Sequence, residues 1–216
     1  MNRIRISATT FGLLRECPRC FWYEVRGVSR PRGMFSSLPS ALDKIIQQET
    51  GAYAVKGQKP VWLRGGCELL TVRKKLESVY KGIEIVGIVD DLVRDERGGY
   101  TIVDYKTSGY QYTREKAEHY YTAQMSIYAW LCEEKGYEPV NGAVLVFFTP
   151  SFHSVMEHEA SEVQFVFDVT VIPVAVNRKY AEDLLGMAVE LIHLREPPDR
   201  ALFCKWCDWL ERRRRS

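Results

Sequence analysis

Asp104 and Lys106 form the pair of residues in this 216-residue sequence whose spacing most directly suggests chemistry. They stand at positions i and i+2 of the apolar, β-branched run "TIVDYKT". In an extended strand their side chains leave the same face, while that of Tyr105 leaves the other. A carboxylate and an ammonium on one face can serve a common site. The alternative is a strand end with solvent-facing charges, because a D-x-K triplet is frequent by chance.

A second carboxylate is expected to join this pair. Residues 81–95 and 100–107 are β-branched runs separated by "ERGG", which predicts a hairpin with a glycine turn. Strand pairing then brings Asp90 close to Asp104. Two converging carboxylates repel each other unless a divalent cation lies between them, and hard oxygen ligands suit Mg²⁺ or Mn²⁺. Such an ion, with a neighbouring ammonium, supplies what phosphodiester hydrolysis needs.

The segment after this hairpin is predicted to be a helix over residues 113–136, with Thr113 as its cap and Gly136 at its end. Gln124 and Tyr128 stand at i and i+4 of this helix and therefore share one face. They could reach the site of the acids. An amphipathic helix also presents these residue types at this spacing without any function.

Two C-x-x-C pairs stand near the ends of the chain, Cys17 with Cys20 and Cys204 with Cys207. This spacing lets both sulfurs of a pair bind one ion, so the four cysteines predict a coordination site. A shared site would join the two ends across residues 21–203 and restrict the unfolded chain. Four thiolates satisfy zinc or an iron–sulfur cluster equally well.

Composition predicts an ordinary folded protein. Hydrophobic residues make up 46% and charged residues 27%, and the net charge of +2 gives no global sign of a nucleic-acid partner. The start "MNRIRISATTFG" lacks the apolar core of a signal peptide, and no run of about 18 apolar residues follows. We therefore expect a soluble, cytoplasmic protein without a membrane partner. Disulfides are rare in that compartment, and Cys67 and Cys132, which have no partner at ligand spacing, are predicted to be small buried residues.

The remaining periodic segments predict a mixed α/β fold. They are a helix over 8–25 that Pro18 kinks or ends, a helix over 40–55, strands over 141–150 and 162–172, and a helix over 176–195. Residues 56–80 are ambiguous. We expect a single domain over 1–216 with a mixed central sheet flanked by helices. Its core would cover about 36–195, and a cysteine-held lobe would combine 7–35 with 196–216.

Three blocks carry a family resemblance: "GIVDDLV", "YTIVDYKTSG" and "YYTAQMSIYAWL". In this order they resemble the RecB-like branch of the PD-(D/E)xK nucleases, whose signature is a G-x-x-D strand, a D-Y-K-T strand and a Q-x-x-x-Y helix. The resemblance implies a restriction-endonuclease-like core. It implies that Asp90 and Asp104 bind the metal, that Lys106 acts in catalysis, and that Gln124 and Tyr128 contact the site or the DNA.

One position departs from that family. The family usually has a histidine ligand on an early helix, and none of the four histidines here is early. Asp43, in "LPSALDKIIQQ", could replace it as an oxygen ligand or as a supporting group; otherwise it is an acidic residue that the helix dipole favours in the first turn. Glu49 is a weaker candidate, and His119 is expected on a helix face near the DNA. The predicted metal ligands are thus Asp43, Asp90, Asp104 and Tyr105.

The flanks "CPRCFWYEV" and "FCKWC" extend the resemblance to RecB-like nucleases of the CRISPR adaptation type and of helicase–nuclease complexes, which carry a [4Fe–4S] cluster. Those proteins usually have one cysteine before the core and three after it, whereas the division here is two and two. Cys20 would have to replace the missing third. The resemblance favours a [4Fe–4S] cluster, with structural Zn²⁺ or unligated thiols as alternatives.

Basic clusters and aromatic residues predict contacts with DNA. The clusters are "VSRPRG", "VRKK" and "RRRR". Lysine and arginine follow a phosphate backbone while aromatic faces stack on unpaired bases. Aromatic residues are more often core than binding surface, so only some of the candidates are expected to line a DNA path. The candidates are Phe21, Trp22, Tyr23, Tyr120, Tyr121, Trp206 and Trp209.

These observations predict an Mg²⁺- or Mn²⁺-dependent nuclease that hydrolyses single-stranded DNA or DNA ends, and they favour an exonuclease over an endonuclease. The setting would be DNA repair, recombination or CRISPR spacer processing, with a protein partner in such a complex. One alternative is a nuclease-like subunit that binds DNA or a partner without cutting. Another is a nucleic-acid-binding module stapled by zinc or a cluster, whose acids are structural.

Overall fold

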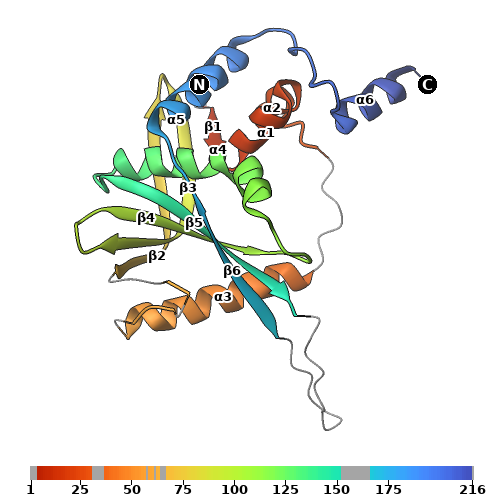
Figure 1. Cartoon of the computed structure of the whole chain (residues 1–216). Coiled ribbons are helices and arrows are strands. Elements are labelled where there is room, and N and C mark those ends of the chain that lie inside the picture. The colour runs from red at the N-terminus through yellow and green to blue at the C-terminus, as the bar shows by residue number, and fades with distance from the viewer. Residues whose placement is uncertain are drawn as a thin grey trace, which may run out of the picture.

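The computed structural model describes residues 4–30, 37–56, 58–60, 62–63, 67–151 and 166–215. Six helices and six strands in this part of the chain form a mixed α/β fold (Figure 1). In chain order they are β1 Arg5–Ser7, α1 Thr10–Glu16, α2 Pro18–Glu24, α3 Ser37–Val55, β2 Cys67–Tyr80, β3 Ile83–Asp95, β4 Tyr100–Thr107, α4 Arg114–Glu133, β5 Val140–Pro150, β6 Phe167–Val174, α5 Arg178–His193 and α6 Lys205–Arg215.

The strands form one mixed sheet built around β3. β2 runs antiparallel to β3 along one side. On the other side β3 pairs with two strands in turn, parallel to β1 at residues 84–86 and antiparallel to β4 at residues 91–94. β5 is parallel to β4, and β6 is antiparallel to β5. The stretch 87–90 of β3 therefore faces the gap between β1 and β4.

Tight turns set the register of the two hairpins around β3. The predicted hairpin of β3 and β4 is confirmed, and Asp95 stabilises its turn by accepting the main-chain N–H groups of Arg97 and Gly99 at 2.9 Å. β2, in the segment that the sequence left unassigned, turns into β3 through Lys81 and Gly82. Both residues have positive φ, 46° and 85°, as a two-residue type I′ turn requires.

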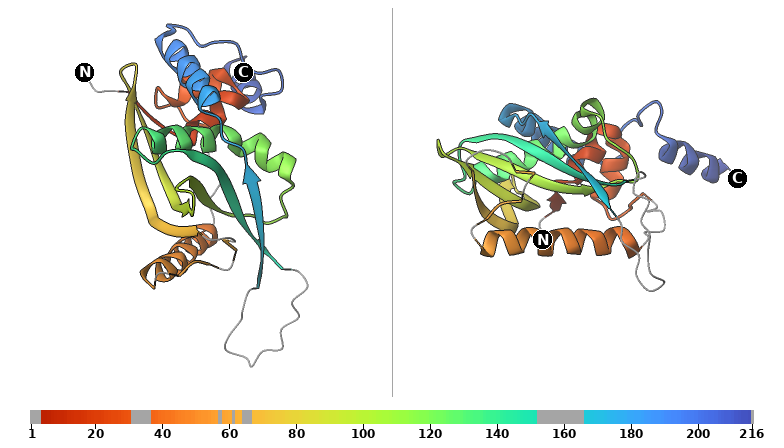
Figure 2. Two further views of the ribbon diagram at one scale, coloured as in Figure 1. Left: turned by 60° about the vertical axis from the view of Figure 1, so that its left-hand side comes forward. Right: turned by 60° about the horizontal axis from the view of Figure 1, so that its bottom comes forward.

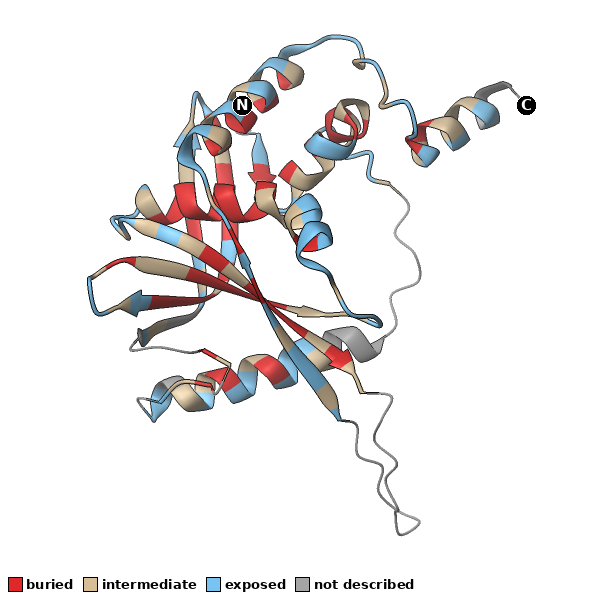
Figure 3. Cartoon of the chain, in the orientation of Figure 1, coloured by how far each residue is buried: buried red, intermediate tan, exposed pale blue. Residues whose placement is uncertain are grey.

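Helices cover both faces of the sheet (Figures 1 and 2). α4 lies across one face and is buried along most of its length between the sheet and helices α1 and α5 (Figure 3). Thr113 caps it as predicted, since its Oγ1 accepts from the N–H of Lys116, and Gly136 follows with φ 82°. α3 lies on the opposite face, where Ile46 packs with Tyr105.

The remaining predicted elements agree with the structure. The predicted strand over 141–150 is β5, and the last predicted helix is α5, whose N-terminus is capped by the Asn177 side chain accepting from the N–H of Tyr180 at 2.8 Å. β6 begins at Phe167, and the predicted strand start at 162 lies outside the described residues. None of the helices described has the length and apolar character needed to span a membrane.

The two ends of the chain meet beside α2. Pro18 is the first residue of α2, so the predicted break in the N-terminal helix is confirmed. The four cysteines of the C-x-x-C pairs cluster where α2 and α6 begin, and α6 lies beside α2 away from the sheet (Figure 1). β1 and α1 instead belong to the main core through Ile6, Phe11 and Leu14. α2 contributes to both parts, because Phe21 packs in the main core while Cys20 lies in the cysteine cluster. The lobe that we propose is therefore smaller than expected and consists of the four cysteines with their flanking residues and α6.

Candidate active site

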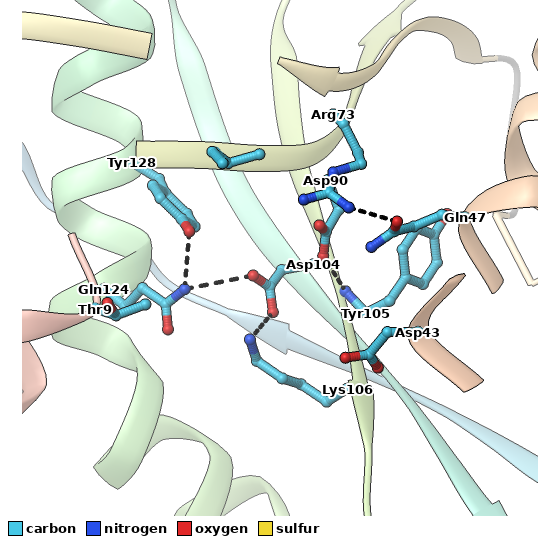
Figure 4. A pocket seen from close by; sticks show the side chains of 11 residues that line it. Thr9, Asp43, Gln47, Arg73, Asp90, Asp104, Tyr105, Lys106, Gln124 and Tyr128 are labelled. Atoms are coloured by element: carbon cyan, nitrogen blue, oxygen red, sulfur yellow. Dashed lines mark hydrogen bonds and ion pairs between the residues drawn. The ribbon is translucent and has the colours of Figure 1, made fainter. Parts of the chain in front are cut away.

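Asp90 and Asp104 meet in a pocket of about 260 Å³ (Figure 4). Asp91 pairs with Val103, so the next step of the same register places Asp90 opposite Asp104. The main-chain N–H of Tyr105 donates to Asp90 Oδ2 at 3.0 Å. Asp104 is 2% exposed. The predicted convergence of the two carboxylates is thus what the hairpin builds.

A change in the side-chain alternation of β3 puts Asp90 on this face. Ile85 and Val89 both belong to the core under α4, because strand residues separated by an even number of positions have their side chains on the same face. Leu92 also belongs to that core, whereas Val93 belongs to the core under α3. The alternation therefore shifts by one residue between Val89 and Leu92. Asp90 lies within this step, and its side chain shares the α4 side of the sheet with Asp104.

Lys106 shares the face of Asp104, as its i+2 spacing predicts. Its Nζ lies 2.5 Å from Asp104 Oδ2, an ionic contact without hydrogen-bond alignment, since this oxygen has no hydrogen-bond partner among the described residues. Burial by itself would lower the pKa of Lys106, but the Asp104 carboxylate outweighs it and raises that pKa to about 12. The side chain is therefore an ammonium throughout the neutral range.

Gln124 and Tyr128 of α4 close the pocket on its helical side (Figure 4). Gln124 Nε2 donates to Asp104 Oδ1 at 3.4 Å and to the Tyr128 hydroxyl at 3.1 Å. Burial raises the pKa of Tyr128 to about 12, so its phenol stays protonated. The i, i+4 pair expected on one helix face is thus brought to the acids.

Gly87 explains the glycine of the G-x-x-D pattern. A Cβ at this position would lie 2.6 Å from Tyr128 Cε1, closer than side chains pack, so only glycine lets Tyr128 lie against β3. We expect Gly87→Ala to lower the free energy of unfolding by roughly 1–3 kcal/mol, because Tyr128 is buried and has no free space to move into. Urea unfolding measures this change. Gly186→Ala in α5, where a Cβ meets nothing within 4 Å, is the matched control and should not destabilise.

Asp43 also lines this pocket, and it comes from α3 on the opposite side of the sheet (Figure 4). Its carboxylate is close enough to act on Asp104, because burial first and Asp43 in addition raise the pKa of Asp104. Asp43 is thus a third acid of this pocket, and its place as the substitute for the family's histidine remains our prediction. Glu49, the weaker candidate, is not among the residues that line the pocket.

Tyr105 contributes main-chain atoms to the pocket and no phenol oxygen. Its hydroxyl donates to Asp91 Oδ2 at 2.5 Å, and its ring lies with Trp62 and Phe148 in the core under α3. A strand residue points its N–H and C=O to the same side, and the N–H of Tyr105 points to Asp90. The metal role predicted for Tyr105 is therefore open to its carbonyl oxygen and closed to its side chain.

The donor set of the pocket fits a hard divalent cation. Three carboxylates line it, and burial, followed by the charge of Asp104, raises the pKa of Asp90 to about 6. Asp104 Oδ2 is a buried oxygen whose charged neighbour is Lys106 Nζ, at 2.5 Å. Oxygen ligands of this kind are those that Mg²⁺ and Mn²⁺ prefer, and a cation would relieve the repulsion between the acids.

The four clustered cysteines form a second candidate metal centre. All four Sγ atoms lie within 4.8 Å of one another, and all four residues are buried. Cys20 Sγ lies 3.4 Å from that of Cys204 and 3.5 Å from that of Cys207, and the Cys17–Cys207 separation is 3.8 Å. The two C-x-x-C pairs thus converge as predicted.

Donors surround these sulfurs. Arg30 Nη2 donates to Cys204 Sγ at 3.7 Å, and the main-chain N–H of Ala201 donates to Cys17 Sγ at 3.4 Å. Such hydrogen bonds favour thiolates over thiols. Cys132 is buried in the main core as predicted, whereas the side chain of Cys67 lies outside the described residues.

Four of the aromatic residues predicted to contact DNA divide into two groups. Phe21 is fully buried, and Trp22, 9% exposed, donates through Nε1 to the carbonyl of Leu194, so both are core residues. Tyr120 and Tyr121 line a hollow that adjoins the pocket. His119 is an exposed helix-face residue whose ring lies against Tyr120. Residues 31–33 and the side chains of 213–215, in two of the basic clusters, lie outside the described residues.

Sequence reasoning missed several neighbours of the acids. Arg73, Gln47 and Thr9 line the pocket, and Asp91 is buried beneath it with its pKa raised to about 6 by burial. Arg73 was visible only as part of a basic cluster, and Asp91 as the second acid of "VDD". No motif distinguished Gln47 or Thr9, because their position depends on how α3 and β1 pack against β3.

Comparison with known proteins agrees with this geometry. The sequence model of the PD-(D/E)XK nuclease superfamily matches residues 30–212. Among solved structures, that of SSO0001 is similar with a TM-score of 0.53 and 18% identity, covering 98% of this chain and 86% of that chain. A phage-related exonuclease from Haemophilus somnus 129PT has a TM-score of 0.47 and 16% identity, covering 91% and 82%. No curated protein sequence matches.

At 18% identity, the similarity to SSO0001 shows no more than a shared fold. The family match is of another kind, because it spans most of the chain and includes the hairpin acids, the lysine and the glutamine helix. Those are the residues that the fold gathers around one pocket. The chain therefore belongs to the PD-(D/E)XK nuclease superfamily.

Proposed function

We propose that this protein is a divalent-metal-dependent deoxyribonuclease that hydrolyses phosphodiester bonds in single-stranded DNA or at DNA ends. The observation that carries the proposal is the convergence of Asp43, Asp90 and Asp104 with Lys106 in one pocket. Acids alone would only bind a cation. An adjoining ammonium adds the positive charge that the reacting phosphate requires.

Asp90, Asp104 and the carbonyl of Tyr105 would hold the cation, with Asp43 in the position of the usual histidine. A bound Mg²⁺ or Mn²⁺ supplies a nucleophilic water at neutral pH and neutralises charge on the phosphoryl oxygens. Lys106 contributes a fixed positive charge beside Asp104. Gln124 orients Asp104 through its amide, and Tyr128 in turn holds Gln124.

Tyrosines beside the pocket support single strands as the substrate. The adjoining hollow shares Thr9 and Gln124 with the pocket and is also lined by Tyr112, Tyr120 and Tyr121. Tyr120 is 49% exposed. Tyrosine faces stack on unpaired bases whatever the sequence, whereas bases paired in a duplex cannot reach them.

For the four-cysteine centre we propose a single tetrahedral ion, zinc, in preference to the [4Fe–4S] cluster that the resemblance favours. Sulfurs on one zinc ion lie about 3.8 Å apart, given Zn–S bonds of about 2.3 Å. Three of the six separations in this centre are 3.4, 3.5 and 3.8 Å, and all six lie within 4.8 Å. A cubane cluster binds each cysteine to a different iron, which needs sulfurs farther apart than one ion does.

Action from DNA ends, and a role in repair, recombination or CRISPR spacer processing with a protein partner, are part of the proposal and rest on the resemblance. One observation favours a second candidate, a subunit that binds DNA without cutting it: the acid at position 43 replaces the expected histidine. The two candidates differ in whether the purified protein catalyses cleavage of DNA.

The test is cleavage of end-labelled DNA by the purified protein with Mg²⁺, with Mn²⁺ and with a chelator. We expect cleavage only with metal, and about tenfold or more faster cleavage of a single strand than of a duplex with blunt ends. A circular single strand separates the modes of attack, since an exonuclease leaves it intact. Binding of the single strand without metal-dependent cleavage would replace the nuclease proposal with the second candidate.

A further inference from the structure

Arg73 of β2 is a positively charged residue of the pocket that the nuclease signature does not include. Val72 pairs with Asp91 and Lys74 with Val89, so Arg73 lies on β2 opposite Asp90. Its side chain lines the pocket together with the acids. In Figure 4 the carboxylates of Asp90 and Asp104 lie between Arg73 and Lys106, so the two cations flank the acids from opposite sides.

The backbone at Arg73 is unusual for a strand residue. Its φ is 52°, in the left-handed region that a Cβ disfavours and that glycine adopts freely. It stands at the step where β3 changes its alternation, so this conformation accompanies the turn of Asp90 toward the pocket. The backbone alone would favour glycine here. An arginine in a strained conformation at an active site points to a task for its side chain.

Among the described residues, the guanidinium of Arg73 is hydrogen-bonded to an amide and forms no ion pair with an acid. Its Nη1 donates to the neutral Oε1 of Gln47 at 2.5 Å. Its side chain is exposed at the mouth of the pocket. Lys106 differs in both respects, because it is mostly buried and lies 2.5 Å from Asp104. Arg73 is therefore the more exposed cation of this pocket, and it can meet an anion beside the one that Lys106 serves.

We propose that Arg73 binds the phosphate next to the scissile one and so sets the register of the DNA strand in the pocket; this inference rests on the proposed nuclease function. The guanidinium presents a planar fork of donors that matches two phosphate oxygens. Gln47 holds the fork from the side of α3. Lys106 remains the cation for the scissile phosphate, and Arg73 is a substrate-binding residue beside it.

The test uses Arg73→Gly, Arg73→Asn and Arg73→Lys. Glycine and asparagine accept positive φ, so both remove the charge without adding backbone strain, and their melting temperatures should be no lower than that of the wild type. We expect both to weaken binding of a single-stranded oligonucleotide by about tenfold or more. The slope of log affinity against log salt concentration should become less steep by about 0.7, which is the contribution of one phosphate contact in a single strand. Lysine should restore the slope and only part of the affinity.

Kinetics and modified DNA locate the contact. The rise in KM should follow the loss of affinity, with kcat within about threefold of the wild type, because a flanking phosphate is bound equally in ground and transition states. Uncharged methylphosphonates placed one at a time beside the scissile position should weaken wild-type binding at one place. At that place the Arg73→Gly protein should show no further loss. Arg97→Gly, in the exposed β3–β4 turn, removes a charge far from the pocket and should match the wild type.

Separate results would overturn the inference and the function on which it rests. If the wild type cleaves DNA and Arg73→Gly matches it in affinity, salt slope and KM, Arg73 binds no phosphate although the nuclease proposal stands. A fall in kcat without a change in KM would also overturn the inference, because Arg73 would then act on the scissile phosphate. Failure of the wild type to bind or cleave any DNA would overturn both.

Discussion

Asp104→Asn should lower the rate of DNA cleavage by about 10³-fold or more. Asparagine keeps the size of the side chain and its hydrogen bond from Gln124, but it removes the charge that a cation and Lys106 share. No other described side chain is placed to replace that charge on β4. The measurement is single-turnover cleavage of a labelled single strand at saturating Mn²⁺.

Lys106→Ala is expected to lower the cleavage rate about 10²–10³-fold in the same assay, since it removes the positive charge beside the reacting phosphate and leaves the acids in place. Because Asp104 and Lys106 act as a unit, the double variant should fall little below Asp104→Asn alone. Strictly multiplicative losses would show instead that the two residues act independently.

Two measurements separate the loss of a catalytic group from a general effect of substitution. The melting temperature of Asp104→Asn tests the fold: burial raises the pKa of Asp104, so its ionised form is costly to bury, whereas the amide leaves Lys106 without its carboxylate, and these two effects oppose each other. Asp168→Asn, an exposed acid of β6 in the same sheet, should cleave at the wild-type rate. A folded Asp104→Asn protein that keeps more than about a tenth of the wild-type rate would contradict the assignment of this pocket as the active site.

Cys207→Ser should remove the metal of the four-cysteine centre and destabilise the protein strongly. Cys207 is 1% exposed, and its Sγ lies 3.5 Å from that of Cys20 and 3.8 Å from that of Cys17. Its substitution therefore removes a buried ligand that lies close to both cysteines of the other pair. The ion proposed for this centre would close a loop between Cys20 and Cys204, which are 184 positions apart. In the chain-entropy account, closing so long a loop contributes about 5 kcal/mol.

Among the described elements, α6 packs chiefly against α2, the helix that carries Cys20, so we expect α6 to depend on this centre. The ion pair between Arg19 and Glu211, at 2.7 Å, joins it to α2, and the Trp206–Trp209 stack lies within α6 itself. We expect the metal content to fall from about one ion per chain to near zero. The melting temperature should fall by roughly 10 °C or more, with α6 released first.

Cys132→Ala is the matched control, since Cys132 is buried in α4 outside the centre and its loss should leave the metal content unchanged. Elemental analysis of the wild type should find zinc. Iron with acid-labile sulfide would overturn the zinc assignment, although the four cysteines would still be a metal-binding centre. Equal stability of Cys207→Ser and the wild type would show that the cluster of thiols holds no structural ion.

The residues recognisable in the sequence are those whose relation is local. The i+2 spacing of Asp104 and Lys106 and the i+4 spacing of Gln124 and Tyr128 fix a shared face once the strand and the helix are predicted, because these periods are properties of the backbone. The hairpin register added Asp90, since a short turn leaves little choice of pairing. The two C-x-x-C pairs were visible for the same reason, as each spans the start of one helix.

The sequence by itself therefore determined the acids, the lysine, the helix pair and the cysteine centre. Only the tertiary structure decided that Asp43 reaches the pocket from the far side of the sheet, that Tyr105 offers its main chain, and that Arg73 completes the rim. Each of these depends on contacts between distant segments or on a break in strand alternation. Periodicity describes a regular backbone. It therefore cannot indicate that Arg73 of β2 takes a left-handed conformation, or that the side-chain alternation of β3 shifts between Val89 and Leu92, and both features direct side chains of the site into the pocket.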